Sequence, residues 1–253
     1  MLWATDLIKN TVLGAGKGVV SGLEPVFAFG ELQTGGSAVN ILLWPVTGIT
    51  AVPVHATGVQ MSLVSSSTSD DEGSTGIEKV TLVYLDANLD QQTEEVTLNG
   101  TSAVTTVATD IRFIQCSYGS QFGSGGRAAG NITISNGGKT YSYISATARR
   151  CSSSARMVPR GKRLVVKGMS AGAIAAAAEA KGLVRLCTTK VYNSSFASSG
   201  YLFPIKSFGV QDSTVSMDDV DYVAGAGEIV ALEASAAADV LLVGSWHGWF
   251  ENA

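Results

Sequence analysis

Residues Gly76–Thr101, GIEKVTLVYLDANLDQQTEEVTLNGT, decide the fold that we expect for this chain. Apolar residues occupy both faces of the period-two pattern over Ile77–Leu85, which predicts a β-strand covered on both sides. The polar stretch Asp86–Gln92 interrupts that pattern. Alternation resumes over Glu94–Leu98, and Asn99-Gly100 is a dipeptide typical of tight turns. The stretch therefore predicts two antiparallel strands of a meander.

The composition favours β structure for the rest of the chain as well. Of the 253 residues, 45% are hydrophobic and only 15% are charged, and 29 are glycine. This balance is typical of turn-rich β proteins, and the length suits one large or two ordinary domains. The formal net charge of −4 disfavours nucleic-acid binding, which needs clustered Lys and Arg. We expect no nucleic-acid partner and, because no apolar run approaches the ~20 residues that span a bilayer, no membrane partner.

The expected fold class is all-β, with two antiparallel β-sandwich domains of jelly-roll-like kind. They occupy residues 26–155 and 156–253, and an extended N-terminal arm occupies residues 1–25. The strands are short alternating or apolar segments between turn residues, predicted near 26–33, 39–44, 59–65, 77–85, 93–98, 103–108, 111–118, 131–134, 140–146, 164–167, 183–189, 201–209, 229–234 and 240–246. Ala171–Leu183 has high helix propensity but is short, so it forms a helix only if it packs.

Several phrases of this sequence resemble virion structural proteins of tailed bacteriophages. They are Tyr84-Leu85-Asp86, Glu95-Val96-Thr97-Leu98-Asn99-Gly100-Thr101 and Gly130-Asn131-Ile132-Thr133-Ile134. In addition, Val158-Pro159-Arg160-Gly161-Lys162 is similar to the Pro-x-Gly-Lys turn that opens the later sandwich of such proteins. The resemblance covers about residues 26 to 250 as a succession of short strands.

The resemblance implies a non-enzymatic structural component of a phage particle, made in the host cytoplasm and located in the virion. The expected role is a capsid decoration or cement protein that stabilises the shell through subunit contacts. Its expected partners are further copies of itself and the major capsid protein or other virion proteins. The alternative is a tail or tail-fibre protein that binds a host receptor or glycan, and a cell-wall hydrolase is a third candidate.

Apolar side chains at the two ends of the chain are the candidate interaction surface. The arm cannot bury its own apolar groups, so they should lie on a neighbouring subunit or on the chain's own sheets. Trp246 and Trp249 could stack on sugar rings, although a strand would direct them to opposite faces. A core strand or a subunit interface is the competing interpretation. The candidate residues are Trp3, Leu7, Ile8, Trp246, Trp249 and Phe250.

The sequence offers no catalytic or cofactor motif, and we expect neither an enzyme nor a cofactor. The only candidate general bases of the histidine type are His55 and His247, and no nucleophile-elbow motif accompanies them. Asp86-x-Asn88-x-Asp90 has alternating oxygen ligands like those that open a calcium loop, but Gln91 and Thr97 stand where such a loop needs Gly and Glu. Gly14–Gly18 contains a G-x-G-x-G string without the strand and helix of a nucleotide site.

Two acidic groups and two basic groups are expected to be surface charges. Asp70-Asp71-Glu72 and Asp218-Asp219-x-Asp221 could hold an adventitious ion, and Arg149-Arg150 and Arg160–Arg163 could bind phosphate. Solvated loops, or interface charges beside the domain junction, are the more common roles of such runs. The cysteines, Cys116, Cys151 and Cys187, have no metal-binding spacing and should behave as small apolar residues, although one pair could oxidise outside the cell.

Overall fold

The structure is a computed structural model that describes residues 22–34, 38–44, 52–175, 182–189, 203–210, 214–217, 220–236 and 239–253. In these ranges all regular secondary structure is β, and every strand pairing is antiparallel. The expected all-β fold class is confirmed. No helix occurs among the described residues, and therefore none that is long and apolar enough to cross a membrane.

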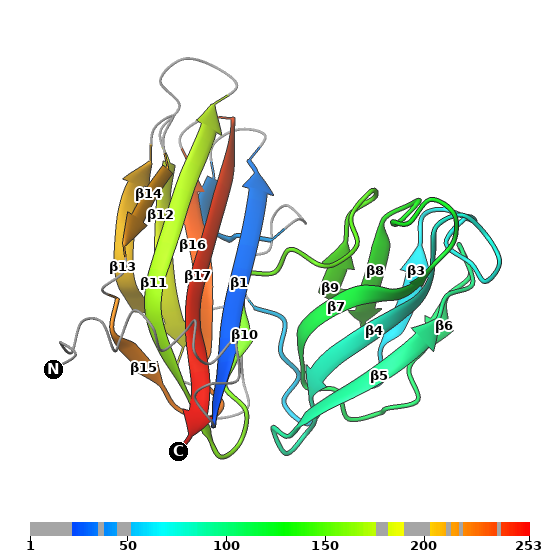
Figure 1. Ribbon diagram of the computed structural model, residues 1–253, viewed down its shortest axis with the longest axis horizontal. Helices are drawn as coiled ribbons and strands as arrows, with labels where there is room; N and C mark the ends of the chain where they lie inside the picture. The colour runs from blue at the N-terminus through cyan, green and yellow to red at the C-terminus, as the bar shows by residue number, and fades with distance from the viewer. Residues whose placement is uncertain are drawn as a thin grey trace, which may run out of the picture.

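Two five-stranded sheets contain both the first and the last strands of the chain (Figure 1). Sheet 1 has the order β1-β17-β11-β14, and β15 also pairs with β11. Sheet 2 has the order β10-β16-β12-β13, and β2 also pairs with β16. The strands of sheet 1 are β1 (Leu23–Gln33), β11 (Lys162–Ala175), β14 (Thr214–Met217), β15 (Tyr222–Ala224) and β17 (Val240–Asn252). The strands of sheet 2 are β2 (Ala38–Leu42), β10 (Arg156–Met157), β12 (Gly182–Thr189), β13 (Phe203–Val210) and β16 (Ile229–Ala236).

Sheets 1 and 2 share one hydrophobic core, and together we call them the outer unit. Alternate residues of β17, including Leu242 and Trp246, pack with Leu232 of β16 and Leu186 of β12. All four side chains are buried to 2% exposure or less. The period-two alternation of these strands places one apolar face inward, and burying that face supplies the main driving force for folding.

Two smaller sheets lie beside the outer unit and form what we call the inserted unit, residues 52–155. Sheet 3 has the order β6-β3-β8-β9 and sheet 4 the order β5-β4-β7. Their shared core includes Leu63, Leu82, Ile114 and Ile134. The strands are β3 (Ser62–Ser65), β4 (Ile77–Leu85), β5 (Gln91–Thr97), β6 (Val104–Thr105), β7 (Phe113–Phe122), β8 (Ile132–Asn136) and β9 (Lys139–Ile144).

A third apolar cluster joins the two units. Trp44 follows β2, Leu85 and Phe113 come from sheet 4, and Met157 and Ile229 come from sheet 2. Each of these side chains is at most 1% exposed. The inserted unit is therefore packed against the outer face of sheet 2 and is not merely tethered to it.

The meander that we expected from the deciding stretch is confirmed. β4 and β5 pair antiparallel with Val80 opposite Val96, and β4 is buried or partly buried along its whole length. Gly100 has a φ of 54°, which L-residues with a Cβ adopt at a cost, so glycine suits this turn.

The first domain that we expected, residues 26–155, differs from the observed strand pairing at its N-terminal side. β1, which the sequence analysis placed in the first domain, pairs along its full length with β17, and β2 pairs with β16. Only residues 52–155 form the inserted unit. Periodicity shows that a segment is a strand, but it carries no information about a partner more than 200 residues away.

The segment with high helix propensity begins as a strand. Ala171–Ala175 completes β11, and Gly182 opens β12, so a helix over Ala171–Leu183 is wrong at both ends. Pairing with β17 outweighs local propensity here. Residues 176–181 lie outside the described residues, as do residues 1–21 of the expected arm.

Candidate functional site

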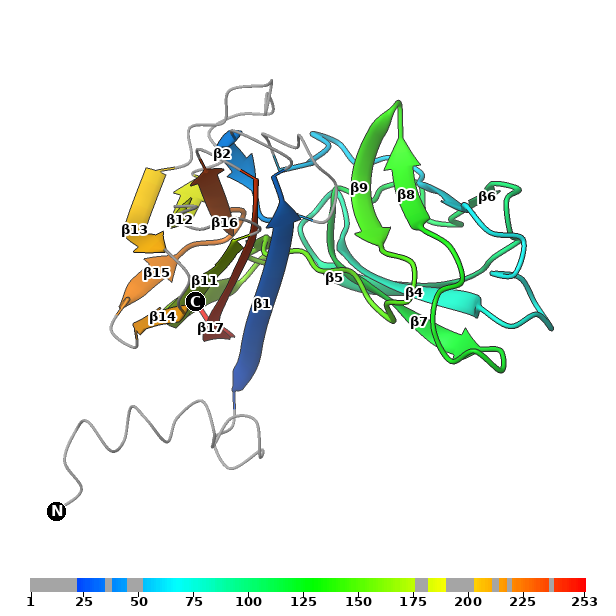
Figure 2. The same ribbon diagram turned by 90° about the horizontal axis from the view of Figure 1, so that it is seen from above.

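An open cleft of about 660 Å³ lies between β1 of the outer unit and sheet 4 with its following segment in the inserted unit. Figures 1 and 2 both place β1 on the side of the outer unit that faces the inserted unit. The outer unit contributes Pro25, Phe27 and Phe29 to the lining, and β7 contributes Tyr118 and Phe122. The segment that leads back to the outer unit contributes Arg149, Arg150, Cys151, Ser152, Ser153 and Arg156.

Aromatic side chains are exposed in this cleft. Phe27 is 55% exposed and Tyr118 is 39% exposed. On β1 the even-numbered residues Val26 and Ala28 face the core, so Phe27 is directed to the opposite face. The guanidinium of Arg149 lies 5.6 Å from the ring centroid of Phe122, a cation–π distance. Exposed aromatic rings of this kind provide apolar contact area for a ligand.

Three guanidinium groups give the cleft a positive charge. Arg156 is held in place: its Nη1 donates to the carbonyls of Ser153 (3.1 Å) and Ala155 (2.7 Å), and its Nη2 donates to the carbonyl of Phe27 (3.3 Å). Burial lowers the pKa of Arg156 from its usual value, but a guanidinium keeps its charge at neutral pH.

No carboxylate among the described residues forms an ion pair with Arg149, Arg150 or Arg156. Glu24, the acid that lines the cleft, is paired with Lys162 at 2.6 Å. The cleft is therefore electropositive in a chain whose net charge is −4, and it favours an anionic group.

The edge of β1 that faces the cleft carries main-chain groups that have no strand partner among the described residues. β1 is the terminal strand of sheet 1, and the N–H of Thr34 donates to the carbonyl of Val240 on the other side, at 3.1 Å. In an antiparallel pair such bonds recur at every second residue, so Phe27, Phe29 and Glu31 direct their N–H and C=O groups away from β17. The bond from Arg156 to the carbonyl of Phe27 agrees with this orientation.

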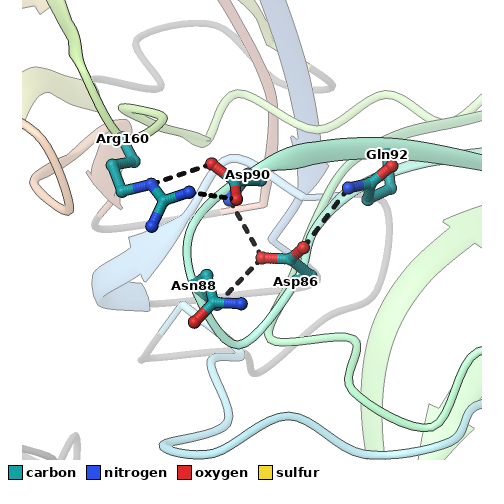
Figure 3. Close-up of polar contacts among 5 residues, drawn as sticks. All are labelled: Asp86, Asn88, Asp90, Gln92 and Arg160. Atoms are coloured by element: carbon teal, nitrogen blue, oxygen red, sulfur yellow. Dashed lines mark hydrogen bonds and ion pairs between the residues drawn. The ribbon is translucent and has the colours of Figure 1, made fainter.

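The calcium-like string Asp86-x-Asn88-x-Asp90 serves a structural role (Figure 3). Oδ1 of Asp86 accepts the backbone N–H groups of Asn88 (2.8 Å) and Asp90 (2.9 Å), and Oδ2 accepts from the amide of Gln92 (3.3 Å). The loop is thus an Asx-type turn. No cluster of His, Cys, Asp and Glu suited to a metal ion occurs in the part of the chain that the structure describes.

Asp90 also connects the two units. Its carboxylate accepts hydrogen bonds from Nε and Nη2 of Arg160, at 3.0 and 2.5 Å (Figure 3). In addition, the backbone N–H of Arg160 donates to the carbonyl of Leu89. The turn Val158–Lys162 therefore contacts the β4–β5 hairpin. Arg160 thus lies where the two units meet.

The aromatic residues proposed as an interaction surface do not form an exposed platform. Trp246 is 0% exposed, Phe250 6% and Trp249 8%; Trp246 and Phe250 belong to the core of the outer unit. Trp246 and Phe250 have the same parity on β17 and face sheet 2, which agrees with the competing interpretation of a core strand, whereas Trp249 has the other parity. Trp3, Leu7 and Ile8 lie outside the described residues.

The other candidate groups are dispersed. Nδ1 of His55 lies 3.5 Å from Oγ1 of Thr57 in the same loop, whereas His247 packs beside Gly168 in sheet 1. Asp70 is fully buried, contrary to the surface loop expected for it, and Asp218 and Asp219 lie outside the described residues. Cys116, Cys151 and Cys187 are free thiols, and the first two line the cleft.

The sequence indicates the basic residues of the cleft but not its aromatic lining. The Arg149-Arg150 pair stands out as a basic cluster, and we expected it beside a junction. Phe27 and Tyr118 gave no signal, because their exposure depends on which strands pair. No family model, no curated protein and no solved structure matches this chain.

Proposed function

We propose that this chain is a non-enzymatic structural component of a tailed-phage particle, acting as a capsid decoration or cement protein. The observation that carries the proposal is the strand order of the outer unit. Its eight principal strands, numbered 1 to 8 in chain order, are β1, β2, β11, β12, β13, β14, β16 and β17. The short strand β15 is counted together with β14.

With that numbering, sheet 1 has the order 1-8-3-6. Sheet 2 has the order 2-7-4-5 when the two-residue strand β10, which shares one edge of β16 with β2, is left out. This is the order of a jelly roll, in which two Greek keys fold into two facing sheets, and viral capsid proteins are a large class of such folds. We accordingly interpret the outer unit as a jelly-roll β-sandwich. The inserted unit is a second sandwich placed between the second and third strands.

The proposed mechanism is burial of surface between subunits. Val107 is 88% exposed and Val223 is 54% exposed, and these apolar groups lie in different units. Specific protein–protein interfaces bury about 1,200 Å² or more in total. A protein that binds only the assembled shell stabilises that state by mass action, without any chemical step.

The second candidate function is a tail protein that binds a host glycan, since jelly rolls also occur in lectins. The exposed rings of Phe27 and Tyr118 in the cleft favour it. The burial of Trp246 and Trp249 removes the surface that first suggested it.

Particles that lack this chain provide the test. We expect purified protein, added to such particles of the phage that encodes it, to bind in hundreds of copies and to raise the temperature at which the shell releases its genome. Binding of a dozen copies or fewer would favour the tail position. No binding to any part of the particle would contradict both.

A further inference from the structure

We propose that the cleft is a docking site for an extended acidic peptide segment, which adds as a strand to the free edge of β1. The proposal deepens the proposed function, and rests on it only for the source of the peptide, another virion protein. The site itself is argued from the described residues of this chain.

The main chain provides the first argument. The N–H and C=O groups of Phe27, Phe29 and Glu31 point away from β17. Within the described part of the chain, their partner on that side is the side chain of Arg156, which donates to the carbonyl of Phe27. An unpaired edge of this length is a template for a further strand. Peptide recognition by strand addition uses this kind of edge.

Charge provides the second argument, and it selects an acidic segment. Arg149 and Arg150 are exposed at the cleft, and neither is in an ion pair with a described carboxylate. Guanidinium groups bind carboxylates in a bidentate manner. In a bound strand, every second side chain points to the same face. Acidic residues at alternate positions of the peptide would therefore all face the arginines of the cleft.

The aromatic side chains complete the site and favour a peptide over a sugar. Phe27 and Tyr118 offer apolar contact to the side chains between the acidic ones. A sugar could stack on the same rings, but it has no repeating main-chain donors and acceptors to match the edge of β1. A bound glycan would therefore leave the regularly spaced main-chain N–H and C=O groups of that edge without hydrogen-bond partners.

The test measures binding of a fluorescein-labelled peptide, TVEVEVT, to the full chain by fluorescence anisotropy. We expect saturable binding, at least tenfold weaker binding of the basic peptide TVKVKVT, and weakening with salt, since the ion pairs are exposed. An acidic peptide methylated on alternate backbone nitrogens should bind at least tenfold more weakly, because it cannot complete the ladder.

Matched variants separate the contribution of charge to peptide binding from that of main-chain hydrogen bonding. Arg150→Gln should weaken binding at least fivefold, whereas Lys139→Gln, an equal charge change on the exposed β8–β9 turn, should leave it unchanged. Phe29→Pro removes an outward N–H but no bond to β17, so the fold should persist. It should weaken binding more than Phe29→Ala, which keeps that N–H.

Three results would overturn the proposal. They are no binding of TVEVEVT up to about 1 mM, equal binding of the methylated peptide, and binding of an acidic oligosaccharide where the peptide fails. The last result would assign the cleft to a glycan. All of these assays use the isolated chain, so their failure would leave the particle-binding result described above untouched.

Discussion

At the scale of single residues, buried polar groups fix the loops of the inserted unit. Asp70 is 0% exposed. Its Oδ1 accepts the N–H groups of Ile77 (2.8 Å) and Ala129 (2.9 Å), and its Oδ2 accepts from the hydroxyl of Ser65 (2.6 Å) and the N–H of Gly130 (2.8 Å). One carboxylate thus connects the end of β3, the start of β4 and the approach to β8.

Asp70→Ala should lower the free energy of unfolding by about 3–5 kcal/mol, because it leaves two buried N–H groups, one partly buried N–H group and the buried hydroxyl of Ser65 without their acceptor. Asp71→Ala is the matched control: Asp71 accepts a bond from the N–H of the exposed Glu72, and its loss should cost less than about 1 kcal/mol. Urea denaturation measures both changes. Equal losses would show that Asp70 does not hold these loops.

The thiol of Cys116 should make stability depend on pH in the alkaline range. Burial, and secondarily Cys151, raise the pKa of Cys116 from 9.0 to about 11. Between these values the folded chain holds a proton that the unfolded chain releases, so the free energy of unfolding falls as pH rises. Cys116→Ala should remove about 2 kcal/mol of the loss between pH 8 and 10.5. Parallel pH curves for the two proteins would contradict this pKa shift.

At the scale of elements, the contact between the units combines an apolar cluster with an exposed ion pair. Phe113 of β7 is 1% exposed and packs in the cluster that joins sheet 4 to sheet 2. The side chains of Arg160 and Asp90 are 63% and 37% exposed. Exposed ion pairs contribute little, whereas a buried phenyl ring contributes several kcal/mol.

Phe113→Ala should therefore destabilise the chain by about 3–5 kcal/mol and Arg160→Gln by less than about 1 kcal/mol. Chemical denaturation followed by tryptophan fluorescence reports on both variants. If Arg160→Gln were the more damaging of the two, the ion pair would be the principal connection between the units.

The elements also show which parts of the fold the sequence can predict. β4 and β5 are adjacent in sequence, and their pairing follows from local alternation and a short loop. The partnership of β1 with β17 joins residues such as Val26 and Gly248, and nothing local encodes it. The cleft depends on that pairing, so its arginines could be anticipated but its aromatic lining could not.

At the scale of the whole molecule, two hydrophobic cores divide the chain into an outer unit and an inserted unit. The inserted unit is continuous in sequence and has its own core, which includes Leu63, Leu82 and Ile134. The outer unit is assembled from both ends of the chain. The two units should therefore differ in which segments of the chain they need in order to fold.

The fragment 52–155 should fold alone, because a contiguous domain of this size with one buried core can be stable. A fragment that starts at residue 45 should lose the structure of the outer unit, since it lacks β1 and β2. Far-UV circular dichroism and amide NMR dispersion test both. An unfolded 52–155 fragment would mean that the two units form one cooperative structure.

We propose that this chain is a capsid component built on a jelly-roll unit. Cryo-electron microscopy of purified particles of the encoding phage tests it most directly. The account predicts density for the two units on the icosahedral shell, in hundreds of copies per particle. Density at the tail or at a single vertex, or absence of the chain from the particle, would contradict the claim.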